Sequence, residues 1–187
     1  MIFNPSITLK TFFGFINRPL IGRLRLLPGV CISKSSEAIC ETISSAVYEI
    51  GDISEILAIS MDGSSFDSTQ NLDLKMFVDN YLYPTIVDWL YPRSPFLQTM
   101  KISYIKTMCM THSYLFRMRL RDRRVALIGL LQGTVKSGHP TDTTAMNTCR
   151  SLYYSFCIEN LAGCKITRVV AGGDMVLFFD KRNLDRV

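Results

Sequence analysis

The stretch Val169–Phe179, which reads VVAGGDMVLFF, constrains the fold of this chain more than any other. Its β-branched and aromatic residues lie on both sides of Gly172 and Gly173, a pattern that predicts two buried strands joined by a tight hairpin. Glycine in the turn permits positive φ and lets the backbone approach a ligand closely. Asp174 follows directly. It is either a metal ligand presented by the hairpin or an acid that suits the turn itself.

Composition and charge limit the class of protein to which the chain can belong. Its 187 residues are 48% apolar and 20% charged, values typical of a globular domain with a sizeable core. The net charge of +5 mildly favours a polyanionic partner. Six cysteines without close pairs and only two histidines offer no zinc set, so we expect reduced thiols. No apolar run approaches the roughly 20 residues that span a bilayer, so we expect no membrane segment.

Three segments carry helical signals. Serines before the first apolar residues of Ser33–Ile50 predict a capped helix that ends at Gly51. Apolar residues recur at helical spacing in Leu72–Leu90 and predict an amphipathic helix interrupted at Pro84. Phe96–Met110 is expected to form a further helix.

A short apolar run, Glu55–Ser60, predicts a buried central strand. It leads into the sequence DGSSFD, which begins at Asp62 and ends at Asp67. An acid at the carboxyl end of a central strand lies where ligand sites tend to form. Asp67 either turns back toward the same cleft or caps the next helix.

Tyr114–Leu131 is predicted to form two strands joined by a turn at residues 121–124. Arg117, Arg119 and Arg121 are spaced by two, which places them on one face of a sheet. A row of planar guanidinium groups can contact phosphates. The alternative is an ordinary solvated sheet face.

A loop rich in Gly and Ser precedes the next predicted helix. It contains Ser137 and Gly138, and the helix is expected to start near Asp142 and to continue past Tyr154. Thr143 and Asn147 are four residues apart in this helix and would share a face. Taken alone, such residues are also common on helix surfaces.

Two carboxylates, Asp62 and Asp174, are predicted at the ends of neighbouring strands. Such a pair can bind two Mg²⁺ ions roughly 3.5–4 Å apart, which clamp the attacking and leaving oxygens of a phosphoryl displacement. Mg²⁺ prefers oxygen ligands and retains waters, so few protein carboxylates are needed. Asp67 and Asn147 would then be able to hydrogen-bond a ribose hydroxyl.

These motifs, in this order, resemble those of the palm domain of RNA-dependent RNA polymerases of positive-strand RNA viruses. DGSSFD at residues 62–67 matches the first palm motif, and SGHPTDTTAMN at 137–147 matches the second. GGDM at 172–175 matches the Gly-Asp-Asp of the third in part, with Met175 in place of its second Asp. The second motif carries one extra residue before Thr143.

The resemblance implies an α+β fold, a polymerase palm whose antiparallel sheet packs on helices, with partial fingers and no thumb. Residues 1–54 would be a partial fingers or lead-in segment. Residues 55–187 would be the palm core, with a fingers insertion around 91–132. The implied activity is RNA-directed RNA synthesis, in which a 3′-hydroxyl attacks the α-phosphate of an NTP and expels pyrophosphate. We expect a core fragment of a viral replicase that does not polymerise alone.

The resemblance also assigns roles to residues. Asp62 and Asp174 would be catalytic and would hold Mg²⁺, with Mn²⁺ as an alternative. The residues implied in nucleotide and ribose selection are Asp67, Ser137, Gly138, Thr143 and Asn147. The candidate contacts to RNA phosphates are Arg117, Arg119, Arg121 and Lys136. The implied partners are RNA template and product, NTPs and other viral replication proteins, in membrane-associated complexes of the host cytoplasm.

Two other classes of protein compete with the polymerase interpretation. A non-catalytic palm-like protein that binds RNA or serves as a scaffold is favoured by Met175, which cannot bind Mg²⁺ as a carboxylate would. GGDM followed by VLFF also resembles the GGDEF hairpin of diguanylate cyclases, although the Glu of that motif is absent. A reverse transcriptase would carry a bulky residue at the position of Asp67.

Overall fold

Two units make up the chain in the computed structural model. One comprises residues 4–66 and 138–187, and the other comprises residues 1–3 and 67–137. The structure describes residues 7–62, 67, 71–77, 80–81, 83–96, 98–99, 113–119, 125–132 and 142–187. The fold is α+β, with a small antiparallel sheet and several helices. The first unit contains this sheet and is called the sheet unit below.

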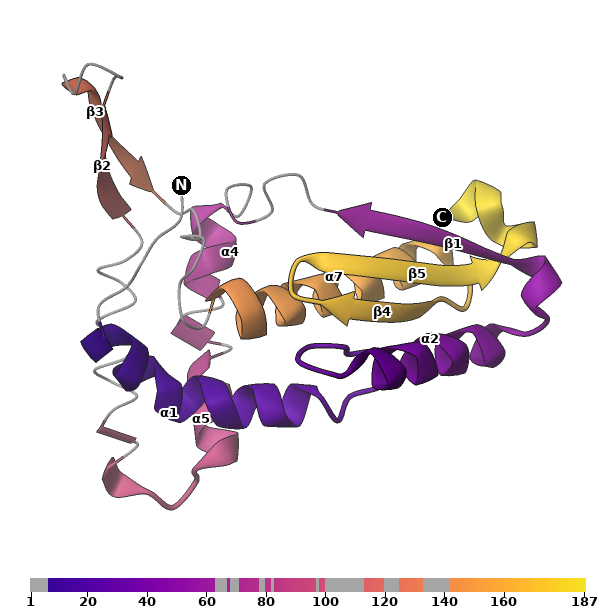
Figure 1. Cartoon of the computed structure of the whole chain (residues 1–187), viewed down its shortest axis with the longest axis horizontal. Helices are drawn as coiled ribbons and strands as arrows, with labels where there is room; N and C mark the ends of the chain where they lie inside the picture. Colours follow the sequence, from indigo (N-terminus) through magenta and orange to yellow (C-terminus); the bar gives the residue numbers. More distant parts are fainter. Residues whose placement is uncertain are drawn as a thin grey trace. The chain divides into compact units, whose positions relative to one another are not determined.

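Three antiparallel strands form the sheet of this unit, in the order β1-β5-β4 (Figure 1). They are β1 (Ile56–Asp62), β4 (Thr167–Ala171) and β5 (Asp174–Asp180). The two residues between β4 and β5 include Gly172, whose φ of 66° lies in the left-handed region that glycine adopts readily. The predicted hairpin is therefore confirmed.

Strand β1 lies at an edge of the described sheet, which corrects the prediction of a central strand. It also extends two residues beyond the predicted Ser60, through Asp62. Exposed Ala58 and Ser60 alternate with half-buried Leu57 and Ile59, as in a strand with one solvated face. β5 takes the central place because Leu177, Phe178 and Phe179 bury side chains on both of its faces.

A helix covers each face of the sheet. On one face, Met175, Leu177 and Phe179 form a core with residues of α7 (Asn147–Ala162). On the other face, Phe178 packs in a cluster with residues of α2 (Ser36–Ile50). Because successive side chains of a strand point to opposite faces, β5 contributes alternately to the two cores.

Helix α2 confirms the prediction of a capped helix. The Ser35 hydroxyl is its N-cap and accepts a hydrogen bond from the Ala38 backbone N–H at 3.4 Å. At the other end, the Gly51 N–H donates to the Val47 carbonyl. The helix begins at Ser36, three residues after the predicted start.

Helix α1 (Ile7–Leu24) was not predicted. It has no acid in its first turn, and Pro19 lies inside it, both of which weaken the helical signal of this segment. Its buried side chains nevertheless recur at helical spacing, at Phe13, Leu20 and Leu24. That periodicity is the signal that identifies the helix.

The helix predicted to start near Asp142 begins with a π-helical segment, η3 (Asp142–Met146), and continues as α7. It ends at Ala162 and is capped by Gly163, which adopts the left-handed conformation with φ 60°. A π-turn bonds residue i to i+5 and is wider than an α-turn. The prediction that Thr143 and Asn147 share a face is based on α-helical spacing. It therefore does not apply to this π-helical segment.

Gly29 belongs to a segment that forms backbone hydrogen bonds with the outer edge of β4. Its carbonyl accepts a hydrogen bond from the Val170 N–H, and the Cys31 N–H donates to the Val170 carbonyl, both at 2.8 Å. Gly29 has a φ of 77°, and a Cβ at this position would collide with the Arg168 carbonyl oxygen. The segment before α2 can therefore approach the strand this closely because it has glycine there.

The described residues of the second unit include helices α4 (Leu72–Phe77) and α5 (Tyr83–Leu90) and a hairpin. The two helices replace the single predicted helix, and Pro84 lies in the first turn of α5, where proline is tolerated. The predicted hairpin is present as β2 (Ser113–Arg119) and β3 (Val125–Gln132). Most of the predicted helix at 96–110 falls outside the described residues. No helix in the described part of the chain is long and apolar enough to cross a membrane.

Candidate functional site

Asp62 and Asp174 lie directly opposite each other across β1 and β5. Residues in register on antiparallel strands have Cβ atoms about 4.5–5.5 Å apart and point to the same face of the sheet. The end of β1 and the β4–β5 turn lie at the same end of the sheet in Figure 1. Both side chains are exposed. The sheet therefore brings together the two carboxylates that the sequence predicted at neighbouring strand ends.

This pair of acids is not compensated by neighbouring protein groups. Within the described residues, neither Asp62 nor Asp174 has an ion pair or a side-chain hydrogen bond. Like charges directly opposite on a sheet repel each other. A cation that the two carboxylates share would remove this repulsion, so the pair has the chemistry of an oxygen-ligand metal site.

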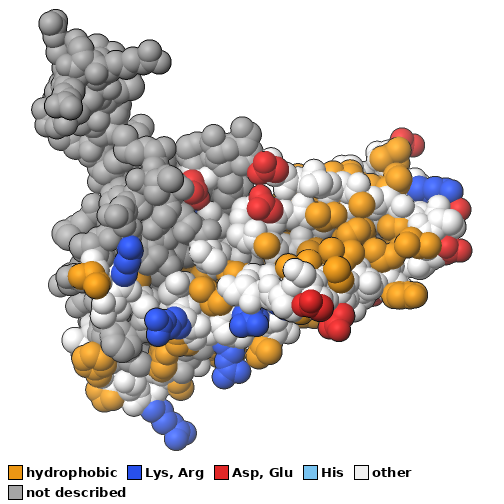
Figure 2. Space-filling model, viewed as in Figure 1, with side chains coloured by type: hydrophobic (Ala, Val, Ile, Leu, Met, Phe, Trp, Pro, Cys, Tyr) orange, Lys and Arg blue, Asp and Glu red, His pale blue; other side chains and the backbone are white. Residues whose placement is uncertain are grey.

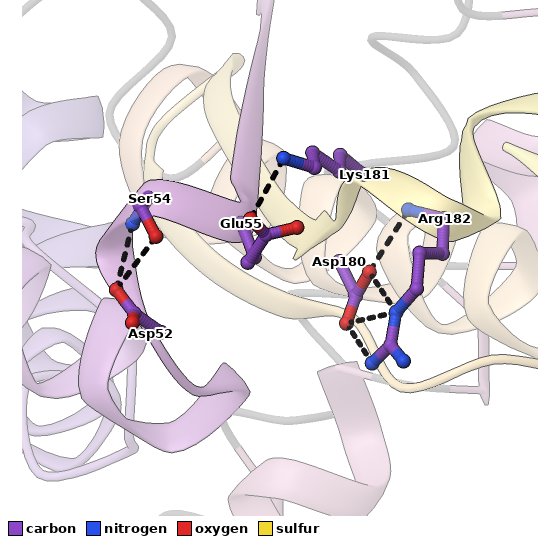
Figure 3. A network of polar contacts seen from close by, with 6 residues as sticks. All are labelled: Asp52, Ser54, Glu55, Asp180, Lys181 and Arg182. Carbon is purple, nitrogen blue, oxygen red and sulfur yellow. Dashed lines mark hydrogen bonds and ion pairs between the residues drawn. The ribbon is translucent and has the colours of Figure 1, made fainter.

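The acids at the opposite end of the same strands are paired (Figure 3). Glu55, the last residue of η1 (Ile53–Glu55), accepts a hydrogen bond from Lys181 at 2.8 Å. Hydrogen bonds from Arg182 lower the pKa of Asp180 to about 2. Those from the Arg182 side chain have the larger effect, and the one from its backbone N–H has the smaller. The contrast between the two ends of the sheet marks Asp62 and Asp174 as the functional candidates.

Helix α7 holds the turn that carries Asp174. Thr148 Oγ1 accepts a hydrogen bond from the Gly172 N–H at 3.0 Å, and Ser151 Oγ donates to the Gly172 carbonyl at 2.8 Å. Thr148 and Ser151 are fully buried. Thr148 also donates to the Thr144 carbonyl at 2.7 Å, which fixes its hydroxyl. We call Thr148 and Ser151 the turn clamp. Sequence reasoning missed it, although two hydroxyl residues three apart at a helix start were its signal.

Asn147, the first residue of α7, is buried beside Arg150. Its Oδ1 accepts a hydrogen bond from Arg150 Nη1 at 2.8 Å. A buried guanidinium requires such acceptors. This bond fixes the orientation of the Asn147 amide.

Met175 is a core residue. Only 6% of it is exposed, and it packs in the cluster on the α7 face of the sheet. Strand alternation points its side chain away from the face that carries Asp174. The position at which the polymerase motif has its second Asp is therefore used here for packing.

Several predicted site residues are described in part or not at all. Asp67 belongs to the second unit, so its position relative to Asp62 is not defined. Thr143 lies in η3 by its backbone. Arg117 and Arg119 lie in β2, where the pairing with β3 shifts register between Met118 and Arg119. Outside the described residues lie Arg121, Lys136, Ser137 and Gly138.

Metal ligation beyond the two acids is not evident in the described part of the chain. It contains no group of three or more His, Cys, Asp or Glu side chains close enough to hold a metal ion. Cys149, near the clamp in α7, is not a candidate nucleophile because burial raises the pKa of its thiol to about 11. Two carboxylates match the small ligand sets of Mg²⁺, which keeps several waters.

No protein-family model matches the sequence, and no curated protein matches it. The functional argument therefore rests on the geometry of Asp62, Asp174 and the turn clamp.

Proposed function

We propose that the sheet unit is the palm of an RNA-directed RNA polymerase and that Asp62 and Asp174 hold its divalent metals. The observation that carries the proposal is the register of β1 and β5, which pairs these two unneutralised carboxylates. The order of the sequence motifs along the chain supports it. The proposed reaction is attack of an RNA 3′-hydroxyl on the α-phosphate of an NTP, with release of pyrophosphate.

In this proposal, the two acids hold the metal, and the turn clamp holds the backbone beside Asp174. Asp62 and Asp174 would bind Mg²⁺, or Mn²⁺ in its place, at the exposed end of the sheet. The bound metal would stabilise charge on the attacking and leaving oxygens. The turn clamp holds the backbone beside Asp174, because two buried hydroxyls fix both polar groups of Gly172. Such preorganisation keeps ligands in place without reorganisation during the reaction.

The remaining roles are part of the same proposal. Ribose selection is assigned to Asn147 and to Asp67, Ser137, Gly138 and Thr143. The residues proposed to contact RNA phosphates are Arg117, Arg119, Arg121 and Lys136. RNA, NTPs and other replication proteins are the proposed partners, in membrane-associated complexes of the host cytoplasm.

A second candidate function is a palm-like RNA-binding scaffold without catalysis. Burial of Met175 favours it, since the residue after Asp174 serves the core and supplies no carboxylate. In this alternative, the sheet and the turn clamp would be retained for their structural role.

Substitution of the two acids tests the proposal. In the full chain, Asp62→Asn and Asp174→Asn should each weaken Mn²⁺ binding, measured by electron paramagnetic resonance. The loss should exceed the roughly 10–100-fold that substitution of a residue behind a metal ligand causes. In the complete replicase of which this chain is proposed to be the core, nucleotide incorporation on a primed RNA template should fall in parallel. Asp185→Asn, which changes an exposed acid in η4 (Lys181–Arg186), is the matched control.

The outcomes separate the candidates. Mn²⁺ binding that ignores both substitutions would refute the metal site and the polymerase proposal with it. Mn²⁺ binding that depends on Asp62 and Asp174, without incorporation by the complete replicase under any condition, would favour the scaffold.

A further inference from the structure

A cleft of about 800 Å³ lies in the sheet unit, away from the two acids. Its walls come from α2, α7, β4 and the connection between α1 and α2. Neither Asp62 nor Asp174 lines it. Small-molecule sites commonly have volumes of about 300–1,000 Å³, so the cleft has the size of a ligand site.

The cleft has an excess of positive charge. Residues 1–36 contain five Lys and Arg and no acid, and Arg25 and Lys34 from this segment line the cleft. Figure 2 shows basic side chains along α1 and where it leads into α2. Lys34 donates a hydrogen bond to the Thr42 hydroxyl at 3.1 Å. In the described part of the chain, neither cation has a carboxylate partner.

The other two cations of the cleft are neutralised. Lys165 pairs with Glu49 at 3.3 Å, and Arg168 pairs with Glu159. The excess charge therefore belongs to Arg25 and Lys34, at the side of the cleft near the α1–α2 connection. Cations in a cleft with low-dielectric walls attract anions strongly.

An aromatic ring stands in the wall that α7 forms. Phe156 of α7 is 53% exposed, although it lines the cleft. The Arg168 guanidinium lies 4.0 Å from the centre of the ring and donates to the Ile166 carbonyl at 2.9 Å. The ring is thus held by a fixed neighbour and still presents surface for stacking. Base stacking on such aromatic side chains tolerates any base.

An unsatisfied donor marks the same wall. Nη1 of Arg168 is buried and has no hydrogen-bond partner among the residues that the structure describes. Buried donors normally have acceptors. An acceptor atom brought by a ligand would satisfy this group after a small movement of the side chain.

We propose that this cleft binds a mononucleotide. Lys34 and Arg25 receive its phosphate, and Phe156 stacks on its base. The Ser45 hydroxyl, which also lines the cleft, offers a hydrogen bond to the sugar, and the Thr42 hydroxyl, which donates to the Ala38 carbonyl, holds Lys34. This site is separate from the two acids and does not depend on the proposed polymerase activity.

Calorimetric titration of the full chain with AMP tests the site. AMP should bind, and adenosine and ribose 5-phosphate should each bind at least tenfold more weakly, because each lacks one of the two recognised parts. Lys34→Glu should weaken AMP binding at least tenfold. Arg186→Glu, which reverses an exposed charge outside the cleft, should leave it unchanged.

The aromatic wall has its own variants. Phe156→Leu retains an apolar side chain but removes the ring, and it should reduce the affinity for AMP to that for ribose 5-phosphate. Phe156→Ala should have the same effect, with circular dichroism to verify the fold. Asp174→Asn should leave AMP binding intact, so that failure of the metal site and failure of the cleft are distinguished.

Three results would overturn the nucleotide site. The first is absence of AMP binding at millimolar concentration. The second is AMP binding that Lys34→Glu and Phe156→Leu leave unchanged. The third is binding of a hexaglutamate peptide, but not of AMP, with sensitivity to Lys34→Glu, because the cleft would then be a docking groove for acidic protein segments.

Discussion

At the scale of single residues, the acids at the two ends of the sheet have different surroundings. Asp62 and Asp174 face each other without a compensating cation among the described residues, whereas Asp180 has Arg182 beside it. The first arrangement leaves the protein with repulsion that a bound ion relieves. The second contributes to stability by itself, in a way that depends on pH.

We predict that Asp180 contributes to the acid limb of stability. Its pKa in the folded protein is about 2, below the ordinary value of 3.8. The contribution is fully present above about pH 4, where the unfolded state is also ionised, and is lost as the pH falls toward 2. Urea unfolding between pH 2 and 5 should therefore show a shallower pH dependence for Asp180→Asn than for the wild type. An identical slope in the two proteins would contradict this, and Asp185→Asn serves as the control.

Gly29 gives a second prediction at this scale. Gly29→Ala should lower the free energy of unfolding by more than about 1 kcal/mol, because the backbone has φ 77° and a Cβ meets the Arg168 carbonyl. Gly14→Ala is the matched change, since Gly14 lies inside α1 with no atom within 4 Å of an added Cβ. It should stabilise the protein by about 0.5–1 kcal/mol. Thermal or urea unfolding measures both, and equal effects would contradict the prediction.

At the scale of elements, α7 acts as the support of the β4–β5 turn. The clamp residues Thr148 and Ser151, three apart on one face of the helix, form hydrogen bonds with the backbone N–H and the carbonyl of Gly172. Since Asp174 follows this turn in the chain, the helix start and the acid are mechanically linked.

We predict that the clamp positions Asp174 for metal binding. Thr148→Val and Ser151→Ala should each destabilise the protein by about 1–3 kcal/mol, because each leaves a polar group of Gly172 without its partner. Each should also weaken Mn²⁺ binding, and Thr148→Ser should restore it. Ser155→Ala is the control, since Ser155 is equally buried in α7 but its hydroxyl donates within the helix, to the Leu152 carbonyl. Mn²⁺ affinity that follows stability alone across this set would refute a positioning role.

The elements also show what the sequence can predict. The hairpin at Gly172, the capped helix α2 and the second hairpin were predicted because their signals are local, in turn glycines, caps and alternation. The edge position of β1 was not, since strand order depends on partners that lie far away in the chain. The turn clamp was not predicted for the same reason, because its two hydroxyl residues lie far from Gly172 in the chain. The π-helical start of α7 has no sequence signature that distinguishes it from an α-turn.

At the scale of the whole molecule, the two acids and the cleft belong to one unit, whereas Asp67, Arg117 and Arg119 belong to the other. Residues 4–66 and 138–187 contain both acids, the turn clamp and the cleft. Residues 67–137 belong, with residues 1–3, to the other unit and are inserted in the chain between β1 and η3. Insertions of this kind are tolerated when the host unit has its own core.

We therefore predict that the sheet unit folds without the inserted unit. Replacement of residues 67–137 by a Gly-Ser linker of about ten residues should preserve a cooperative thermal transition. AMP binding should survive, because every residue of the cleft is retained. Circular dichroism and calorimetry measure these properties. A non-cooperative transition would show that the inserted unit is required for the fold.

The pairing of β1 with β5 has a consequence for how the chain reaches its native state. The two strands lie on opposite sides of the inserted unit in the sequence, so their contact closes a very long loop. Loop closure of this kind is entropically unfavourable and slows folding. During synthesis, β1 would have to wait with Leu57 and Ile59 uncovered until β5 is made. The two acids meet only at that late step, so the candidate metal site is also a marker of complete folding.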